Sequence, residues 1–285
     1  MKIVLDCNNI CHIAMHSMGE LSYHEMQTGV VYGFFLKLLS VAREFNSNQF
    51  TLCWDSRRSI RQHYFPDYKR KRREAREEMT QEERKRYMSM AEQIKQLRTE
   101  ILPGLGFKNN FLQSGYESDD LMAYIVKANK DADWLMVTSD NDMYQCLEYC
   151  DIYNPQTKKV INAYSFVEKY RIQPHQWVQA KAIGGCDSDN VPGVPGVSDP
   201  KRETSKALKY IRGELTKGKI FERIESSDNL IDRNIALVAL PLAQLDTSRL
   251  TVSDCAFDAG EFRYTFEYLG FSSFMRDFDK WEVFF

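Results

Sequence analysis

The chain has 285 residues, of which 43% are hydrophobic and 27% are charged, and its formal net charge at pH 7 is -2. This length is enough for one α/β unit with an appended helical part, and no apolar run approaches the roughly 18 residues that mark a membrane-spanning helix. The first residues also lack the basic and apolar segments of a secretion signal, so we expect a cytoplasmic protein with no membrane partner.

Strand-like and helix-like patterns alternate in the first half of the chain. Short apolar runs predict strands at Lys2–Asp6, Gln49–Asp55 and Trp134–Val137, and the spacing of apolar residues predicts helices at Val30–Phe45 and Ser118–Ala128. Two short apolar pieces within residues 151–163 are typical of a hairpin. Helical patterns dominate afterwards. The sequence therefore predicts an α/β core with a mostly parallel sheet, followed by a helical region.

A heavily charged stretch follows the second predicted strand. From Arg57 to Arg86 there are twelve Lys or Arg residues and six Asp or Glu residues, a local excess of about six positive charges. Few large apolar residues occur before Met88, so a helix here either reaches into solvent or awaits a ligand. A solvated charge run is one interpretation. A polyanionic partner such as nucleic acid is the other.

Acidic residues gather in five short clusters, and several of them follow an apolar run. Because the carboxyl ends of parallel strands meet at one edge of a sheet, we expect Asp6, Asp55 and Asp140 to lie close together. Capping of a helix start would explain one or two of the acids in 117–120, but not all three. The nine candidate ligands are Asp6, Asp55, Glu117, Asp119, Asp120, Asp140, Asp142, Asp187 and Asp189. Hard divalent cations such as Mg²⁺ are the natural partners of this much negative charge.

Cysteine and histidine usage gives no sign of a zinc finger. The seven cysteines are an odd number without a CxxC pair, which favours free buried thiols in a reducing compartment. His12 and His16 have the i, i+4 spacing of a helical metal site, but no third ligand accompanies them, so packing is the favoured interpretation.

The segment from Gly184 to Val197 is the most specific part of the sequence, because its paired glycines allow close backbone approach and its helix start can hold a phosphate. Together with the acidic clusters, it makes the chain resemble the 5′-nuclease superfamily, the flap endonucleases and 5′-3′ exonucleases of phages and of bacterial DNA polymerase I. The matching segments, in chain order, are Asp6–Asn9, Gly29–Phe34, Trp54–Asp55, Phe65–Arg72, Glu117–Asp120, Asp140–Asp142 and Asp189–Gly196.

The resemblance implies a PIN-like sheet flanked by helices. It places the nuclease core in residues 1–170, with a helical arch at about 57–100, and a helix-three-turn-helix region with C-terminal helices in residues 171–285. The implied activity is that of a metal-dependent 5′-3′ exonuclease or structure-specific flap endonuclease, which hydrolyses phosphodiesters of 5′-ended or branched DNA, and of RNA primers in RNA–DNA hybrids, during replication. A monomer is expected.

The resemblance also assigns the site residues. Two Mg²⁺ ions, for which Mn²⁺ substitutes, would clamp the scissile phosphodiester. One ion is assigned to Asp6, Asp55, Glu117, Asp119 and Asp120, and the other to Asp140, Asp142, Asp187 and Asp189. Lys69 and Arg72 would stabilise the charge that builds on the phosphoryl oxygens. Tyr68 would stack on the terminal base, and DNA phosphates would be contacted by Arg70, Lys71, Lys201 and Arg202.

Three departures from the family pattern stand out. Relatives have Gly-Asp-x-x-Asp-Asn where this chain places Cys186 at the first Asp, so either the loop shifts to bring in Asp187 or one metal position is weakened, since a thiolate is too soft for Mg²⁺. Ile13 stands near a place where relatives often carry Arg. Residues 197–202 replace the usual third glycine, which weakens the K⁺ site that relatives form there.

Other interpretations stay open. Cys186 motivates a structure-specific DNA-binding protein with a weakened metal site, whereas a PIN-like ribonuclease fits the acidic core but not the long arch. The aromatic residues 278–285 resemble peptides that dock on sliding clamps, without their usual leading Gln, and core packing is the favoured alternative. A sliding clamp or a single-strand-binding protein is accordingly a candidate partner.

Overall fold

The computed structural model describes residues 1–18 and 21–285. Its centre is a six-stranded sheet in the order β5-β4-β1-β6-β7-β8. The strands are β1 (Lys2–Asp6), β4 (Phe50–Trp54), β5 (Asn110–Leu112), β6 (Trp134–Val137), β7 (Asp151–Asn154) and β8 (Lys159–Ile161). All neighbours in this sheet are parallel except β7 and β8, which form the predicted hairpin. The mostly parallel sheet is therefore confirmed.

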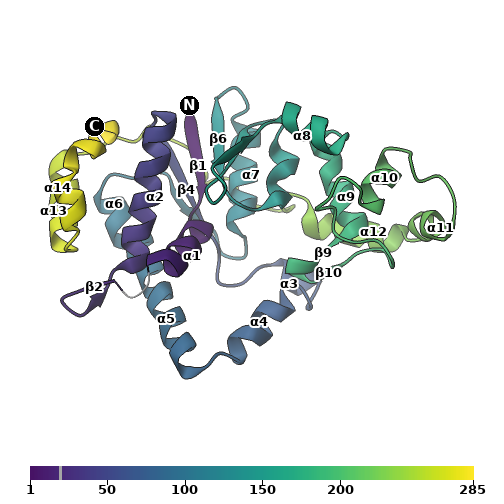
Figure 1. The fold of residues 1–285 in the computed structure, drawn as a ribbon, viewed down its shortest axis with the longest axis horizontal. Helices are drawn as coiled ribbons and strands as arrows, with labels where there is room; N and C mark the ends of the chain where they lie inside the picture. The colour runs from purple at the N-terminus through teal and green to yellow at the C-terminus, as the bar shows by residue number, and fades with distance from the viewer. Residues whose placement is uncertain (19–20) are drawn as a thin grey trace.

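Helices cover both faces of the sheet. Successive side chains of β1 point to opposite faces, so Ile3 and Leu5 pack with α2 (Gly29–Phe45), whereas Val4 packs with α7 (Ser118–Ala128). Helix α1 (Cys7–Met18) joins α2, and α8 (Ala163–Tyr170) lies on the side of α7 (Figure 1). Two short antiparallel pairs complete the strands: β2 (Ser22–Tyr23) with β3 (Met26–Gln27), and β9 (Gly185–Cys186) with β10 (Val191–Pro192).

The charged stretch forms an arch that projects from the carboxyl edge of the sheet (Figure 1). It consists of α3 (Arg61–Tyr64), α4 (Arg70–Glu77) and α5 (Gln81–Gln96), which runs through a π-helical turn, Leu97–Ile101, into α6 (Leu102–Gly104). Helix α4 buries no residue at all, and α5 begins at a capping box formed by Thr80 and Glu83. The far end of α5 is fixed because Gln93 Oε1 accepts the backbone N–H groups of Val30 and Val31.

A helical region follows the sheet on the side opposite α2 (Figure 1). Its elements are the 3-10 helices η3 (Pro174–Gln176) and η4 (Asp187–Asp189) and the helices α9 (Trp177–Gly184), α10 (Lys206–Ile211), α11 (Lys219–Glu225) and α12 (Asp228–Val238). Helix α9 packs on α12 and on the 3-10 helix η2 (Asn141–Cys146), and this contact brings its end to the acidic edge. Within the described ranges, no helix is both long enough and apolar enough to cross a membrane.

The C-terminal segment returns to the first face of the sheet. Helices α13 (Ala259–Tyr268) and α14 (Ser272–Arg276) and the 3-10 helix η5 (Phe278–Phe284) pack beside α2 (Figure 1). Trp281 is fully buried and meets the rings of Phe35 and Phe266. Core packing of the aromatic tail is thus confirmed, and its buried rings are not presented to a sliding clamp. The C-terminal helices of the predicted second region thus pack in the same hydrophobic cluster as β1 and α2.

Candidate active site

Three carboxylates meet at the carboxyl edge of the sheet. Asp6 is the last residue of β1, Asp55 directly follows β4, and Asp140 follows β6 by three residues. These strands are adjacent and parallel, so their ends open on one side of the sheet. The structure therefore places the three acids together, as the alternation of apolar runs and acids predicts.

The start of α7 binds this group of acids together. The Ser118 hydroxyl donates to Asp6 Oδ1 at 3.2 Å, and the Ser118 backbone N–H donates to Asp55 Oδ1 at 2.8 Å. The Thr138 hydroxyl donates to the other oxygen of Asp6 at 3.4 Å. A helix N-terminus carries partial positive charge, so α7 stabilises the cluster and fixes its spacing.

The negative charge at this edge is only partly compensated. Burial and the neighbouring Asp55 raise the pKa of Asp6 to about 7, and burial and Asp142 raise the pKa of Asp140 to about 6. Burial and Asp140 also raise the pKa of Asp119 well above its ordinary value. In addition, Asp119 Oδ1 is buried and has no hydrogen-bond partner among the described residues. The raised pKa values and the unpartnered buried oxygen show uncompensated negative charge at Asp6, Asp119 and Asp140, with Asp55 beside them, which makes this edge a candidate cation position. Among the described residues, the ligand atoms that lie within 4.8 Å of one another are those of Asp142, Cys186 and Asp189.

A second group lies at the base of the arch, where Lys69 and Arg72 both contact acids, although the Arg72 side chain is 49% exposed and that of Lys69 only 20%. Lys69 Nζ donates to Glu117 Oε1 at 2.7 Å, and Arg72 Nη2 donates to Asp189 Oδ1 at 2.8 Å. The arch and the acidic loop are also joined through the backbone, because Lys69 N–H donates to the carbonyl of Asp189 at 2.8 Å and Lys71 N–H donates to Asn190 Oδ1 at 3.0 Å. Burial of Glu117 is outweighed by Lys69 and Arg61, which lower its pKa.

Tyr68 does not present its ring for stacking. The residue is 3% exposed, and its hydroxyl donates to Glu117 Oε2 at 2.9 Å and lies 3.1 Å from Asp189 Oδ2. The predicted role on a terminal base needs correction for this reason. Tyr68 instead ties the two acids to the arch base, where Lys69 lies over its ring at 5.1 Å.

Asp120 forms a buried ion pair, which differs from the predicted role as a metal ligand. Both of its oxygens accept from the Arg61 guanidinium, at 2.7 and 2.8 Å, and both residues are almost completely buried. The same oxygens accept the backbone N–H groups of Glu117 and Leu242. With four donors on two oxygens, Asp120 has no lone pair directed at the acidic edge. Arg61 was not singled out from the sequence, because it lies in a block of like charges.

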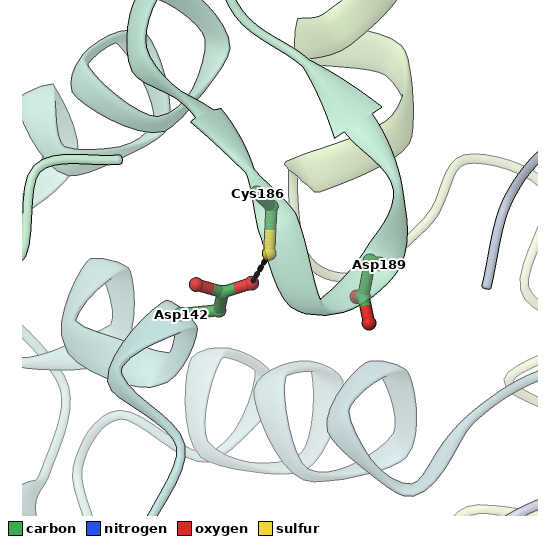
Figure 2. A group of neighbouring side chains, drawn as sticks. All are labelled: Asp142, Cys186 and Asp189. Atoms are coloured by element: carbon green, nitrogen blue, oxygen red, sulfur yellow. Dashed lines mark hydrogen bonds between the residues drawn. The ribbon is translucent and has the colours of Figure 1, made fainter. Parts of the chain in front are cut away.

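Cys186 occupies the place that the family pattern gives to an Asp. Its thiol is buried and donates to Asp142 Oδ2 at 3.6 Å, and the Ser188 hydroxyl lies 3.1 Å from the sulfur. Figure 2 shows Cys186 and Asp142 facing each other, with Asp189 across the loop. Asp187 is exposed, so the loop shift that would bring it inside is not observed. Burial and Asp142 raise the pKa of the Cys186 thiol to about 12.

Lys181 is a further residue of the site that the sequence did not indicate. Only 2% of this residue is exposed, and its ammonium group lies 2.7 Å from Asp142 Oδ1 and 2.9 Å from Asp199 Oδ1. Burial is outweighed by these two carboxylates, of which Asp142 has the larger influence, so the pKa of Lys181 is raised and the group stays charged. A single Lys in a helical pattern does not indicate a role in the site, because its partners Asp142 and Asp199 are distant in the sequence.

The predicted phosphate contacts lie on the surface. Arg70, Lys71, Lys201 and Arg202 are all exposed. Arg70 pairs with Asp67 and Glu74, and Lys201 lies 3.4 Å from Asp199 Oδ2. The pairs of Arg70 are exposed on both sides, so they contribute little and exchange easily for a phosphate, whereas Lys201 lies against a buried carboxylate.

Residues 1–171, which are more than half of the chain, match the family model described as 5′-3′ exonuclease, N-terminal resolvase-like domain. The chain belongs to this family of 5′-3′ exonucleases. The expected 5′-nuclease superfamily and the nuclease class are thereby confirmed.

Individual relatives agree with this assignment. DNA polymerase I of Mycobacterium bovis is 28% identical over an alignment 293 residues long, gaps included, and the alignment covers 92% of this chain and 30% of the polymerase. The chain thus spans less than a third of the DNA polymerase I that it matches. A 5′-3′ exonuclease of Halalkalibacterium halodurans is 31% identical over 203 residues, or 68% of this chain and 61% of that protein.

Solved structures show the same fold. The T5 5′-exonuclease with bound zinc superposes with a TM-score of 0.70 at 22% identity and covers 84% of this chain and 89% of its own. Flap endonuclease-1 from Methanococcus jannaschii gives a TM-score of 0.54 at 15% identity, with 94% and 86% covered. The PIN-like α/β fold class is therefore confirmed.

Proposed function

We propose that this chain is a metal-dependent 5′ nuclease that hydrolyses phosphodiesters at the 5′ ends or flaps of DNA, including RNA primers on DNA. The observation that carries the proposal is the acidic edge formed by Asp6, Asp119 and Asp140, with the cationic base of the arch directly beside it. An anionic backbone and divalent cations are the partners that satisfy both charges.

The acidic edge would hold the first cation through Asp6, Asp119 and Asp140, with Asp55 as a further acceptor. Mg²⁺ is the ion we assign there, with Mn²⁺ as a substitute, because every available ligand is an oxygen. Held by these residues, the ion would supply the Lewis-acid chemistry that activates a water molecule and stabilises the leaving oxygen. Ser118 and Thr138 keep Asp6 in place through the hydrogen bonds described above.

Lys69 and Arg72 would act on the substrate phosphate. Their charged groups now rest on Glu117 and Asp189, within the same group of acids. A phosphodiester at the acidic edge would lie beside both residues, and its oxygens would compete with the carboxylates for their N–H donors. Cations placed where charge develops stabilise the transition state more than the ground state.

The arch and the exposed basic residues would select the substrate. Helix α4 buries no side chain, and Arg70, Lys71 and Arg72 at its start are exposed, with Arg70 and Arg72 paired to acids. Arg73 instead donates to the backbone carbonyls of Pro66 and Tyr68. A 5′ single strand passing beside α4 would replace these weak pairs. Lys201 and Arg202, beyond the glycine-rich loop, would contact duplex phosphates. Most of the binding free energy would be electrostatic and would fall steeply with salt.

A structure-specific DNA-binding protein with little catalysis is the second candidate. It is favoured by Cys186, which stands where the family pattern has a carboxylate, and by Lys181, whose ammonium group pairs with Asp142 at the second cation position. Titration of Mg²⁺ and Mn²⁺ against a labelled 5′-flap duplex separates the two candidates. Cleavage supports the nuclease, whereas tight flap binding without product at any metal concentration supports the second candidate.

Lys69→Ala tests the assignment within the nuclease. We expect the single-turnover rate at saturating DNA to fall by about 10²–10³-fold, with a change in flap affinity below about tenfold. Lys280→Ala, on the opposite side of the molecule, is the matched control and should alter neither quantity. Equal losses of rate and affinity in Lys69→Ala would make this residue a phosphate anchor only.

A further inference from the structure

The second cation position has an unusual set of ligands. Asp142, Cys186 and Asp189 offer one sulfur and two carboxylate groups, and their ligand atoms all lie within 4.8 Å of one another (Figure 2). The side chains of Asp142 and Asp189 are each 15% exposed, so one side of the group reaches solvent. Three protein ligands with one open side is the arrangement in which proteins hold a catalytic zinc ion.

The backbone keeps the sulfur in this position. Gly185 has φ +80°, and a Cβ built on it would lie 2.4 Å from the backbone nitrogen of Gly193. A Cβ on Gly193 would lie 2.4 Å from the carbonyl of Gly184. These contacts leave no room for the loop to slide by one residue, which is what exchanging Cys186 for Asp187 would require. The thiol is therefore a fixed member of the group.

The two carboxylates are already neutralised by nearby cations. Lys181 lies 2.7 Å from Asp142 Oδ1, and Arg72 lies 2.8 Å from Asp189 Oδ1. A hard ion such as Mg²⁺ binds through the negative charge of its oxygen ligands, and little uncompensated charge is left for it here. A softer ion gains additional bonding from sulfur, which does not depend on that charge.

We propose that Asp142, Cys186 and Asp189 form a mixed thiolate–carboxylate site that binds Zn²⁺-class cations in preference to Mg²⁺. This inference rests on the proposed function, because it specifies the ion at the second position of that same site. Binding replaces the S–H bond of Cys186 by a metal–sulfur bond, and the proton leaves to solvent without any change of oxidation state. A substrate phosphate or water would take the open side.

Cadmium is the probe for this site, because a cadmium–thiolate bond has a charge-transfer absorption in the ultraviolet that carboxylates lack. Metal-free full-length protein is titrated with Cd²⁺, and we expect the band to saturate at one equivalent. Zn²⁺ should abolish the band by competition at far lower concentration than Mg²⁺. In Cys186→Ser we expect the band to disappear and Cd²⁺ affinity to fall more than about tenfold.

The controls separate binding at Cys186 from binding at other thiols. Cys186→Ser should fold, because its hydroxyl can keep the contacts with Asp142 and Ser188, and circular dichroism checks this. Cys255→Ser, whose hydroxyl can still donate to the Phe50 carbonyl, should retain the band. Cys186→Asp should lose the band and gain affinity for Mg²⁺ and Mn²⁺. Persistence of the band in folded Cys186→Ser, or equal Mg²⁺ affinity in wild type and Cys186→Asp, would overturn the inference.

The same samples distinguish failure of this inference from failure of the proposed function. If the wild type cleaves the flap but the absorption band persists in Cys186→Ser, the proposed nuclease function stands and the zinc-class site is refuted. If the band depends on Cys186 but neither the wild type nor Cys186→Asp cleaves the flap, the zinc-class site stands and the nuclease function is refuted.

Discussion

Asp119 and Asp120 are neighbours on α7, and replacing each by Asn should have opposite effects. Asp120 lies in a closed arrangement in which each oxygen accepts one N–H of Arg61 and one backbone N–H. In Asp120→Asn, the NH₂ group replaces one of these oxygens and faces one pair of N–H donors, which it cannot accept. Asp119 has a buried oxygen without a partner, in an environment that disfavours its charge. Asn at this position relieves repulsion.

The size of the effect at Asp120 follows from burial. Arg61 is 1% exposed and Asp120 is completely buried, so the substitution leaves a desolvated guanidinium group with an incomplete partner. Breaking a buried pair of this kind costs about 3–5 kcal/mol. With an unfolding entropy of about 2.1 cal/mol/K per residue, this corresponds to a fall in Tm of about 5–8 °C for a chain of this length. In Asp119→Asn, the metal-free protein should unfold at the same or a higher temperature than wild type at pH 8.

Thermal unfolding with and without Mn²⁺ measures both effects. We expect Mn²⁺ to stabilise wild type and Asp120→Asn by similar amounts, and to stabilise Asp119→Asn much less, because only Asp119 belongs to the cation site. If Asp120→Asn kept the Tm of the wild type but lost the effect of Mn²⁺, Asp120 would be a metal ligand and the structural role argued above would be refuted.

Two further predictions concern pH and the aromatic tail. The pKa is raised to about 7 at Asp6 and to about 6 at Asp140, so the folded metal-free protein binds more protons than the unfolded chain between about pH 4 and 7. Its unfolding free energy should therefore fall as the pH rises through this window, by about 1.4 kcal/mol per pH unit for each additional proton bound. Tm measured with chelator across this range should show the decline, and Asp6→Asn should reduce it; an undiminished slope in that variant would contradict the assignment. Trp281→Ala should lower the unfolding free energy by about 3–5 kcal/mol in urea denaturation, because Trp281 is fully buried. Phe285 is 47% exposed, so Phe285→Ala should change the unfolding free energy by less than about 1 kcal/mol. Equal small effects of the two substitutions would show that the tail is not part of the core.

The regular elements could be predicted because local patterns determine them. The bounds predicted for β1, α7 and β6 agree with the structure, since each apolar run or helical pattern there stops at a polar residue. Convergence of Asp6, Asp55 and Asp140 followed from the parallel sheet alone. The sequence also contains the signal for the start of α5 within the arch, which is the capping box of Thr80 and Glu83.

The remaining features depend on contacts between distant segments. Arg61 and Asp120 are 59 residues apart, and nothing local distinguishes Arg61 from the other arginines of its block. Lys181 becomes part of the site only because α9 packs on η2 and brings it to Asp142. For Cys186 the sequence left two placements open. The close approach of Gly185 and Gly193 decides between them, and glycine spacing alone does not reveal this approach.

The backbone hydrogen bonds between the arch base and the acidic loop have a mechanical consequence. Lys69 and Lys71 are hydrogen-bonded to Asp189 and Asn190. An outward movement of the first turn of α4 would therefore also displace the strand pair β9–β10, which carries Cys186. If Asp142, Cys186 and Asp189 hold the proposed cation, its binding should therefore also restrain the movement of the arch base.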